Sequence, residues 1–200
     1  MGKPTDQRVA KAAKPIIGLA GGIGAGKSAV AAVLAEWGAA VVDADRLNHE
    51  VLDSPEVLET LRQWWGEGVA TPEGRADRDA IRRIVRDRSD ELRRLEGLVH
   101  PRIAQRSEKL IAAYEADPRV RAIVWDAPLL FEAGLDRRCD YIVFVDADPL
   151  VRFRRLRAAR NWTADDLEGL EDSQKPLNFK RYQADYIIDN NADREALRRQ

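Results

Sequence analysis

Cysteine, long apolar runs and net charge are all scarce in this sequence of 200 residues. Cys139 is the one cysteine, so no disulfide can form within the chain, which is typical of a reducing compartment. No apolar run approaches the roughly 18 residues of a membrane span, and residues 1–14 lack the apolar core of a secretory signal. We therefore expect a cytoplasmic protein without a membrane partner, in which Cys139 is a small buried side chain near a strand.

The charges nearly cancel, since 33 lysines and arginines face 34 aspartates and glutamates and leave a formal net charge of −1. A nucleic-acid-binding protein is usually basic, so no nucleic-acid partner is expected, although the balance leaves room for a local basic pocket that binds a phosphorylated small molecule. The dipeptide Asn-Lys does not occur either. Guanine-nucleotide switches read guanine with an Asn-Lys-x-Asp segment, so this absence counts against that class.

Short apolar runs alternate with segments of helical spacing, and this pattern predicts an α/β fold. Helical spacing over 27–37 follows the first run, and a long helical stretch over about 46–118, including a helix from Pro101 to Tyr114, separates the second run from the third. We expect a three-layer, doubly wound, five-stranded parallel sheet with a helical insertion. The predicted strands are 16–20, 39–45, 121–126, 140–146 and 185–189.

A glycine-rich loop follows the first predicted strand and opens the first helix. Its sequence, Gly21-x-x-x-x-Gly26-Lys27-Ser28, matches a phosphate-binding loop, in which main-chain N–H groups and a helix N-terminus surround a polyphosphate. Lys27 would reach the β- and γ-phosphates, and the Ser28 hydroxyl would bind Mg²⁺. The alternative, a glycine turn that binds nothing, is disfavoured by the flanking strand and helix. The predicted nucleotide-binding residues are Gly22, Ile23, Gly24, Ala25, Gly26, Lys27, Ser28 and Ala29.

Carboxylates stand at the ends of two further predicted strands, where ligands bind in doubly wound sheets. Asp43 and Asp45 follow the second strand; Asp45 is a candidate base for an acceptor hydroxyl, and the alternative is that both aspartates only cap the next helix. Asp126 ends the third strand and would bind Mg²⁺ through water, or else is a turn residue. Glu132 is a weaker candidate of the same kind.

Arginines crowd the helix predicted after the fourth strand. Guanidinium groups on a lid stabilise the charge that spreads over a phosphoryl group during its transfer. The alternative for any one of them, and the favoured one for most, is a solvated helix face. The arginines concerned are Arg152, Arg154, Arg155, Arg157 and Arg160.

Taken together, a set of motifs resembles the dephospho-coenzyme A kinase family over residues 16–195. The motifs, in chain order, are GLAGGIGAGKS, VVDAD, LVHPRI, APLLFEAGL, YIVFVDADP and ADYIIDNN. The resemblance implies a kinase that uses ATP and Mg²⁺ to phosphorylate the 3′-hydroxyl of the ribose of dephospho-CoA, the last step of coenzyme A synthesis. It implies no obligate protein partner.

The resemblance also implies a domain plan. One P-loop kinase domain would occupy 16–200, after a loose extension over 1–15 that lies outside the resemblance. Within that domain the core would be 16–45 and 119–200, the helical acceptor-binding subdomain about 46–118, and the lid about 154–175.

The resemblance assigns roles to individual residues. Asp45 would be the base, Arg155 and Arg160 would lie in the lid, Gln174 would follow the lid near the substrate, and Asn190 would lie near the adenine. His100 would lie at the edge of the acceptor site, or would only shape the chain before Pro101.

The chain departs from the family pattern at three places. Ala20 stands where threonine is common, Asp126 stands where an apolar residue is usual, and the segment RLRAARNW carries one residue more than the usual lid spacing, which bears on the assignment of Arg160. A kinase of the same fold with another acceptor, such as a nucleoside or a nucleoside monophosphate, is the remaining rival.

Overall fold

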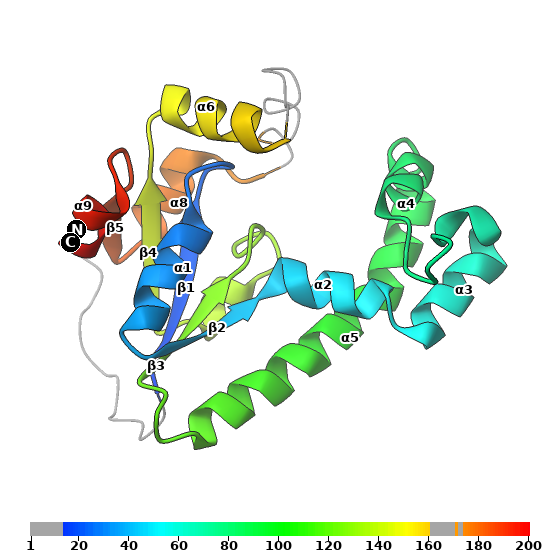
Figure 1. Cartoon of the computed structure of the whole chain (residues 1–200), viewed down its shortest axis with the longest axis horizontal. Helices are drawn as coiled ribbons and strands as arrows, with labels where there is room; N and C mark the ends of the chain where they lie inside the picture. Colours follow the sequence, from blue (N-terminus) through cyan, green and yellow to red (C-terminus); the bar gives the residue numbers. More distant parts are fainter. Residues whose placement is uncertain (1–13, 161–170, 172–173) are drawn as a thin grey trace. The chain divides into compact units, whose positions relative to one another are not determined.

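The structure contains a five-stranded sheet (Figure 1). The computed structural model describes residues 14–160, 171 and 174–200, without the side chains of residues 159 and 160. The strand order is β2-β3-β1-β4-β5, with parallel pairing of β1 to β3 and β4 and of β4 to β5, so the predicted α/β class with a parallel sheet is confirmed. The strands are β1 (Ile16–Gly21), β2 (Ala39–Asp43), β3 (Ala122–Asp126), β4 (Tyr141–Asp146) and β5 (Tyr186–Asp189).

The chain divides into two compact units, Met1–Val42 with Ala113–Gln200, and Asp43–Ala112. The sheet unit contains the helices α1 (Lys27–Glu36), α6 (Pro149–Arg160), α8 (Leu177–Gln183) and α9 (Arg194–Arg198), with a 3-10 turn at Leu135–Arg138. The helical unit contains α2 (Ala44–Leu52), α3 (Pro55–Trp65), α4 (Arg78–Val85) and most of α5 (Ser89–Ala116), with a 3-10 turn at Glu67–Val69.

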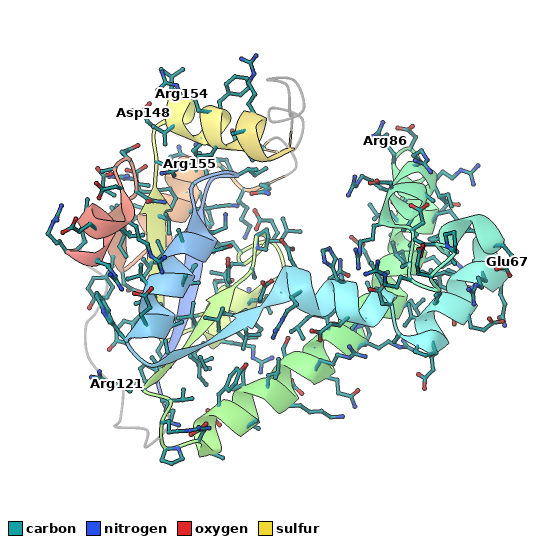
Figure 2. The ribbon with its side chains drawn as sticks, viewed as in Figure 1. Glu67, Arg86, Arg121, Asp148, Arg154 and Arg155 are labelled. Atoms are coloured by element: carbon teal, nitrogen blue, oxygen red, sulfur yellow. The ribbon has the colours of Figure 1, made fainter. Side chains whose placement is uncertain are left out.

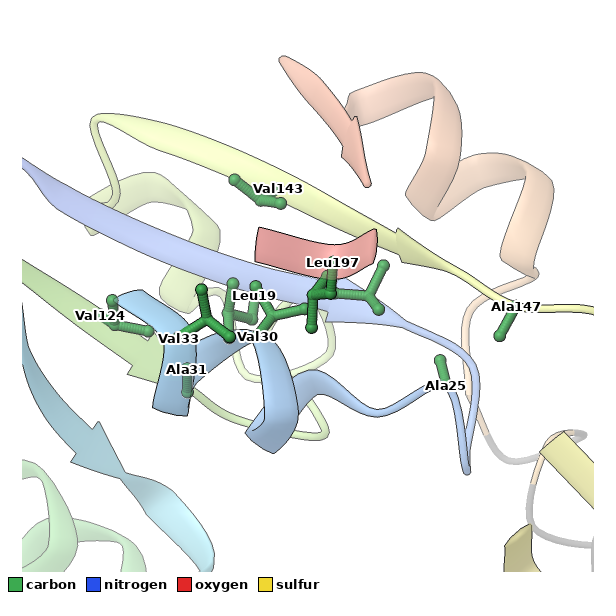
Figure 3. Packing of buried hydrophobic residues seen from close by; sticks show 10 residues of the cluster. Leu19, Ala25, Val30, Ala31, Val33, Val124, Val143, Ala147 and Leu197 are labelled. Carbon is green, nitrogen blue, oxygen red and sulfur yellow. The ribbon is translucent and has the colours of Figure 1, made fainter. Parts of the chain in front are cut away.

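One face of the sheet is covered by α1 and α9, whose apolar side chains meet those of β1 and β3 (Figure 3). Leu19 is fully buried there with Val30 and Val33 of α1, Val124 of β3 and Leu197 of α9. Each such side chain contributes on the order of 2 kcal/mol when it is removed from water. This packing holds the end of β1 and the start of α1 together, and the glycine-rich loop lies between them.

Gly18 of β1 packs closely against Cys139 and Leu130. A Cβ at this position would come within 2.8 Å of Cys139 Sγ and 2.9 Å of Leu130 Cδ2. Cys139, just before β4, is half-buried, and burial is the main cause that raises the pKa of its thiol to about 12. It is therefore a protonated packing residue at neutral pH. Helix α8 contacts β1 and β4.

The helical unit has its own apolar core. Val57 and Leu61 of α3 are fully buried, and Ile81 of α4 and Val99 of α5 pack into the same cluster. Trp65 packs against this cluster, and its indole N–H donates to Glu91 Oε2 at 2.9 Å. The apolar periodicity that predicted helices over this stretch therefore reflects a core of its own.

The predicted helix start at Pro101 is wrong, since α5 runs without a break from Ser89 to Ala116 with Pro101 inside it. A proline ring within a helix presses on the carbonyl four residues earlier, which here belongs to Gly97. Val99, packed in the core of the helical unit, supports the helix on the N-terminal side of the proline. Because residue 100 is helical, the alternative in which His100 only shapes an extended chain before the proline is also wrong.

Within the part of the chain that the structure describes, no helix has both the length and the apolar character needed to cross a bilayer.

Candidate nucleotide-binding and phosphoryl-transfer site

The glycine-rich loop joins β1 to α1, and its backbone requires glycine at the helix start. Gly26 is the N-cap of α1 with φ of 90° and ψ of 34°, in the left-handed region that other residues rarely adopt. Gly26 has no side chain to accept a hydrogen bond from the first turn, which also contains no acidic residue. The N–H groups and the positive end of the helix dipole thus favour an anion at this end of α1.

Side chains from outside the loop hold two of its carbonyls. Arg152 Nη1 donates to the carbonyl of Ile23 at 3.3 Å, while the carbonyl of Ala25 accepts from Arg155 Nη1 at 3.2 Å and from Asn190 Nδ2 at 2.8 Å. In a planar trans peptide the following N–H points away from the carbonyl. The N–H groups of the two residues that follow, Gly24 and Gly26, are therefore directed away from these side chains, as an anion-binding concavity requires.

Asn190 lies behind the loop. It follows β5, is 5% exposed, and its backbone N–H donates to the carbonyl of Asp146 at 2.7 Å. A Cβ on Gly26 would come within 2.2 Å of its Nδ2 atom. The resemblance placed Asn190 near an adenine; the contacts of its side chain are with the loop carbonyl.

The arginines of α6 differ in exposure, and Figure 2 labels one exposed and one half-buried arginine, Arg154 and Arg155. Arg154 and Arg157 are exposed, as the solvated-face alternative predicted, whereas Arg152 is only 5% exposed and pairs with Glu171. Arg155 is half-buried, and its Nη2 donates to the carbonyl of Asn190 at 2.8 Å. The sequence did not single out Arg152. Its position in the helix could have indicated its burial. Arg152 precedes Arg155 by three residues and the buried Leu156 by four, so all three lie on one helix face.

Arg160 ends α6, and its side chain lies outside the described residues, as do most residues of the expected lid.

Lys27, Ser28 and Asp126 lie at the carboxyl edge of β1 and β3. Lys27 Nζ donates to the carbonyls of Gly21 and Gly22 at 3.3 and 3.1 Å. Ser28 Oγ donates to Asp126 Oδ2 at 2.8 Å, and Asp126 is 7% exposed. A hydroxyl and a carboxylate that close together are hard oxygen ligands of the kind Mg²⁺ prefers, so these residues fit a magnesium ion that keeps most of its waters.

In the helical unit, Asp43 and Asp45 have different surroundings. The carboxylate of Asp43 accepts from the backbone N–H of Arg46 at 2.9 Å, so Asp43 is the N-cap of α2 and the predicted strand 39–45 ends at this residue. Asp45 is exposed in the first turn of α2. The capping alternative thus holds for Asp43, and Asp45 is not the cap. His100 is exposed on α5.

Gln174 precedes α8 and is half-buried, and its Oε1 accepts from Lys180 Nζ at 2.8 Å. Lys180, which is 1% exposed, also pairs with Glu132 at 3.0 Å. Nothing in the sequence pattern identified Lys180, because its partners lie six residues before it and far back in the chain.

Comparison with known proteins assigns the chain to a family. A family model described as dephospho-CoA kinase matches residues 15–195. The chain belongs to the dephospho-CoA kinase family.

Relatives of similar length support the assignment to the dephospho-CoA kinase family. A dephospho-CoA kinase from Corynebacterium glutamicum is 37% identical over 182 residues, covering 90% of each chain. A crystal structure of a Thermus thermophilus protein is 33% identical and covers 94% of each chain, with a TM-score of 0.80. A dephospho-CoA kinase from Campylobacter jejuni, 20% identical, covers 93% of each chain with a TM-score of 0.64 and shows the shared fold.

In this dephospho-CoA kinase family member, Gly26→Ala should abolish high-affinity nucleotide binding. Alanine is strained at φ of 90°, and its Cβ would meet Asn190 Nδ2 at 2.2 Å, so the loop must move. We expect affinity for ATP, measured by titration calorimetry, to fall at least about 100-fold, the loss expected when several charge-assisted hydrogen bonds break. Gly74→Ala, at another left-handed glycine with nothing within 4 Å of its Cβ, is the control, and ATP affinity there should be unchanged. Unaltered ATP affinity in Gly26→Ala would contradict the loop assignment.

Proposed function

We propose that this chain transfers the γ-phosphoryl group of ATP to the 3′-hydroxyl of the ribose of dephospho-CoA and so produces coenzyme A. The observation that carries the proposal is the glycine-rich loop at the start of α1, in a chain that belongs to the dephospho-CoA kinase family over residues 15–195. The family supplies the acceptor, and the loop supplies the nucleotide site.

On the nucleotide side, main-chain N–H groups bind the phosphates. The residues assigned to ATP are Gly22 to Ala29, with Lys27 neutralising the charge on the β- and γ-phosphates. In the structure Lys27 Nζ already lies at the loop, bonded to the carbonyl of Gly22 at 3.1 Å. Binding of a polyphosphate would then require only a local movement of this flexible side chain.

Ser28 and Asp126 are the residues proposed to hold Mg²⁺. The ion would neutralise charge on the ATP phosphates when bound. Ser28 would bind through its hydroxyl and Asp126 through water. In the structure the two side chains are hydrogen bonded at 2.8 Å, so both could contact the same ion or its waters.

On the acceptor side, Asp45 is the proposed base. It follows β2 in the first turn of α2, and its side chain is exposed to solvent. A carboxylate that accepts the proton of the hydroxyl makes the oxygen a better nucleophile for the γ-phosphorus. We assign dephospho-CoA binding to the helical subdomain of about 46–118, with His100 at the edge of the site, and we assign Gln174 as a further substrate-binding residue.

The arginines of α6 are proposed to act in two ways. Both terminal nitrogens of Arg155 donate to carbonyls, those of Ala25 and Asn190, so Arg155 would act by holding the loop. Arg160, at the end of the helix, would stabilise the charge on the transferring phosphoryl group as part of a lid over about 154–175. Arg155→Ala should accordingly raise the KM for ATP, whereas Arg160→Ala should lower kcat.

A panel of acceptors tests the function. The purified protein is incubated with Mg-ATP and, separately, with dephospho-CoA, adenosine, AMP and shikimate, and the products are identified by mass. We expect a mass increase of one phosphoryl group on dephospho-CoA alone, and none when GTP replaces ATP at limiting concentration. Phosphorylation of a nucleoside or a nucleoside monophosphate in preference to dephospho-CoA would replace the proposal by its rival of the same fold.

The proposed reaction also bears on the partners and the cellular location of the enzyme. ATP and dephospho-CoA are the only partners that the proposal needs, so neither nucleic acid nor an obligate protein partner enters it. With one cysteine in the chain, we propose that it works in the cytoplasm.

A further inference from the structure

Lys180 is a cation buried within the sheet unit. It lies on α8 and is 1% exposed, a burial that is costly for an ammonium group unless opposite charge and acceptors surround it. Both are present: Nζ lies 3.0 Å from Glu132 Oε1 and donates to Gln174 Oε1 at 2.8 Å. The three side chains form one compact polar cluster, here called the Lys180 cluster.

The Lys180 cluster ties two segments of the chain together. Glu132 Oε1 also accepts from the backbone N–H of Lys175 at 2.7 Å, and Lys175 Nζ donates to the carbonyl of Phe131 at 3.2 Å. The rings of Phe131 and Phe179 pack edge to face, with centroids 5.7 Å apart. The backbone next to Gln174 is therefore hydrogen bonded to the segment after β3, which restrains the position of Gln174.

Glu132 stays ionised at neutral pH, which keeps the pair charged. Burial raises the pKa of its carboxyl, but the hydrogen bonds from Lys180 and from the backbone of Lys175 outweigh burial and leave the pKa below its ordinary value. The ion pair therefore adds stability above the ordinary carboxyl pKa and loses it as the pH falls through the lowered value.

The chemistry of lysine determines which atom of the Gln174 amide faces Lys180. An ammonium group has only donors, so the amide must turn its oxygen to Lys180. Its nitrogen, Nε2, carries both N–H donors on the other branch of the amide. We propose that Lys180 is a positioning residue, neutralised by Glu132, that fixes Gln174 as a hydrogen-bond donor toward anionic or carbonyl-like oxygens of the bound reactants.

This inference rests on the proposed function, because it takes Gln174 as a substrate-binding residue. It adds the polarity of the contact: Gln174 donates, and so it selects phosphate or ribose oxygens and disfavours an N–H group of the ligand in that place. A preset donor spares the reactants the cost of turning the amide on binding.

The test measures kcat and KM for both substrates in Lys180→Met, Gln174→Met and the double variant Gln174→Met/Lys180→Met. Each single variant should lower kcat/KM about tenfold, as loss of one hydrogen bond would. The double variant should be no slower than Gln174→Met, because Lys180 acts through Gln174. Arg199→Met, at an exposed arginine after α9, should leave kcat/KM unchanged.

A second variant separates positioning from folding. Lys180→Met leaves Glu132 without its buried partner, so it should lower the midpoint of thermal unfolding; Glu132→Gln/Lys180→Met removes both charges and should restore most of that stability. Because neither variant orients Gln174, kcat/KM should stay low in both. Recovery of kcat/KM together with stability would make Lys180 a structural residue and overturn the inference.

The remaining outcomes are equally decisive. Wild-type kcat/KM in Lys180→Met, or further loss when Lys180→Met is added to Gln174→Met, would overturn the inference and leave the proposed function in place. Failure of the wild-type protein itself to phosphorylate dephospho-CoA would instead overturn the proposed function and this inference with it.

Discussion

Replacement of Lys27 by alanine should reduce phosphoryl transfer by on the order of 10³-fold or more, because a preorganised charge at the transferring group is lost. The lysine lies in the glycine-rich loop, where its ammonium group bonds to the carbonyls of Gly21 and Gly22. As ATP enters, the same group would move to its phosphates. The measurement is the initial rate of coenzyme A formation at saturating Mg-ATP and dephospho-CoA.

The fold should survive this change. Lys27 is half-buried at the start of α1 and contributes nothing to the apolar cluster around Leu19, so the thermal midpoint should stay within a few degrees of wild type. Arg199→Ala, at an exposed cation after α9, is the control and should turn over normally. Normal turnover of Lys27→Ala itself would refute the assignment of the loop to the phosphates.

Replacement of Asp45 by asparagine should lower kcat by on the order of 10²–10⁴-fold, the usual contribution of a general base. Asparagine keeps the size of the side chain and removes its ability to take a proton. ATP affinity should be nearly unchanged, since Asp45 is assigned to the acceptor alcohol and not to the nucleotide. Rapid-quench measurement of the chemical step, together with ATP titration of each variant, separates the two effects.

Asp43→Asn provides a control two residues away. Asp43 caps α2, and asparagine caps a helix about as well as aspartate does, so this variant should keep both stability and turnover. A fall in ATP affinity in Asp45→Asn, with normal turnover of the bound complex, would make Asp45 a nucleotide or metal residue. Equal losses of turnover in the two variants would point to a shared structural effect instead.

The parts of the site that depend on local chain geometry could be predicted from the sequence. The spacing from Gly21 to Ser28 is that of a phosphate-binding loop. It predicts such a loop here because an apolar run precedes it and an amphipathic helix follows it. The apolar runs likewise predict buried parallel strands. The helix boundary at Pro101 was wrong because packing of Val99 in the core of the helical unit outweighs the local preference of the chain before a proline.

The sequence by itself determined the glycine-rich loop between β1 and α1, the parallel α/β class and, through its set of motifs, the family. Only the tertiary structure decided which charged side chains are buried and what they hold: Arg152 and Asn190 against the loop carbonyls, and Lys180 between Glu132 and Gln174. The physical reason is distance along the chain. A turn or a strand depends on near neighbours, whereas the Arg152 and Asn190 contacts join positions more than 100 residues apart, and Lys180 meets Glu132 from 48 residues away, once the sheet brings them together.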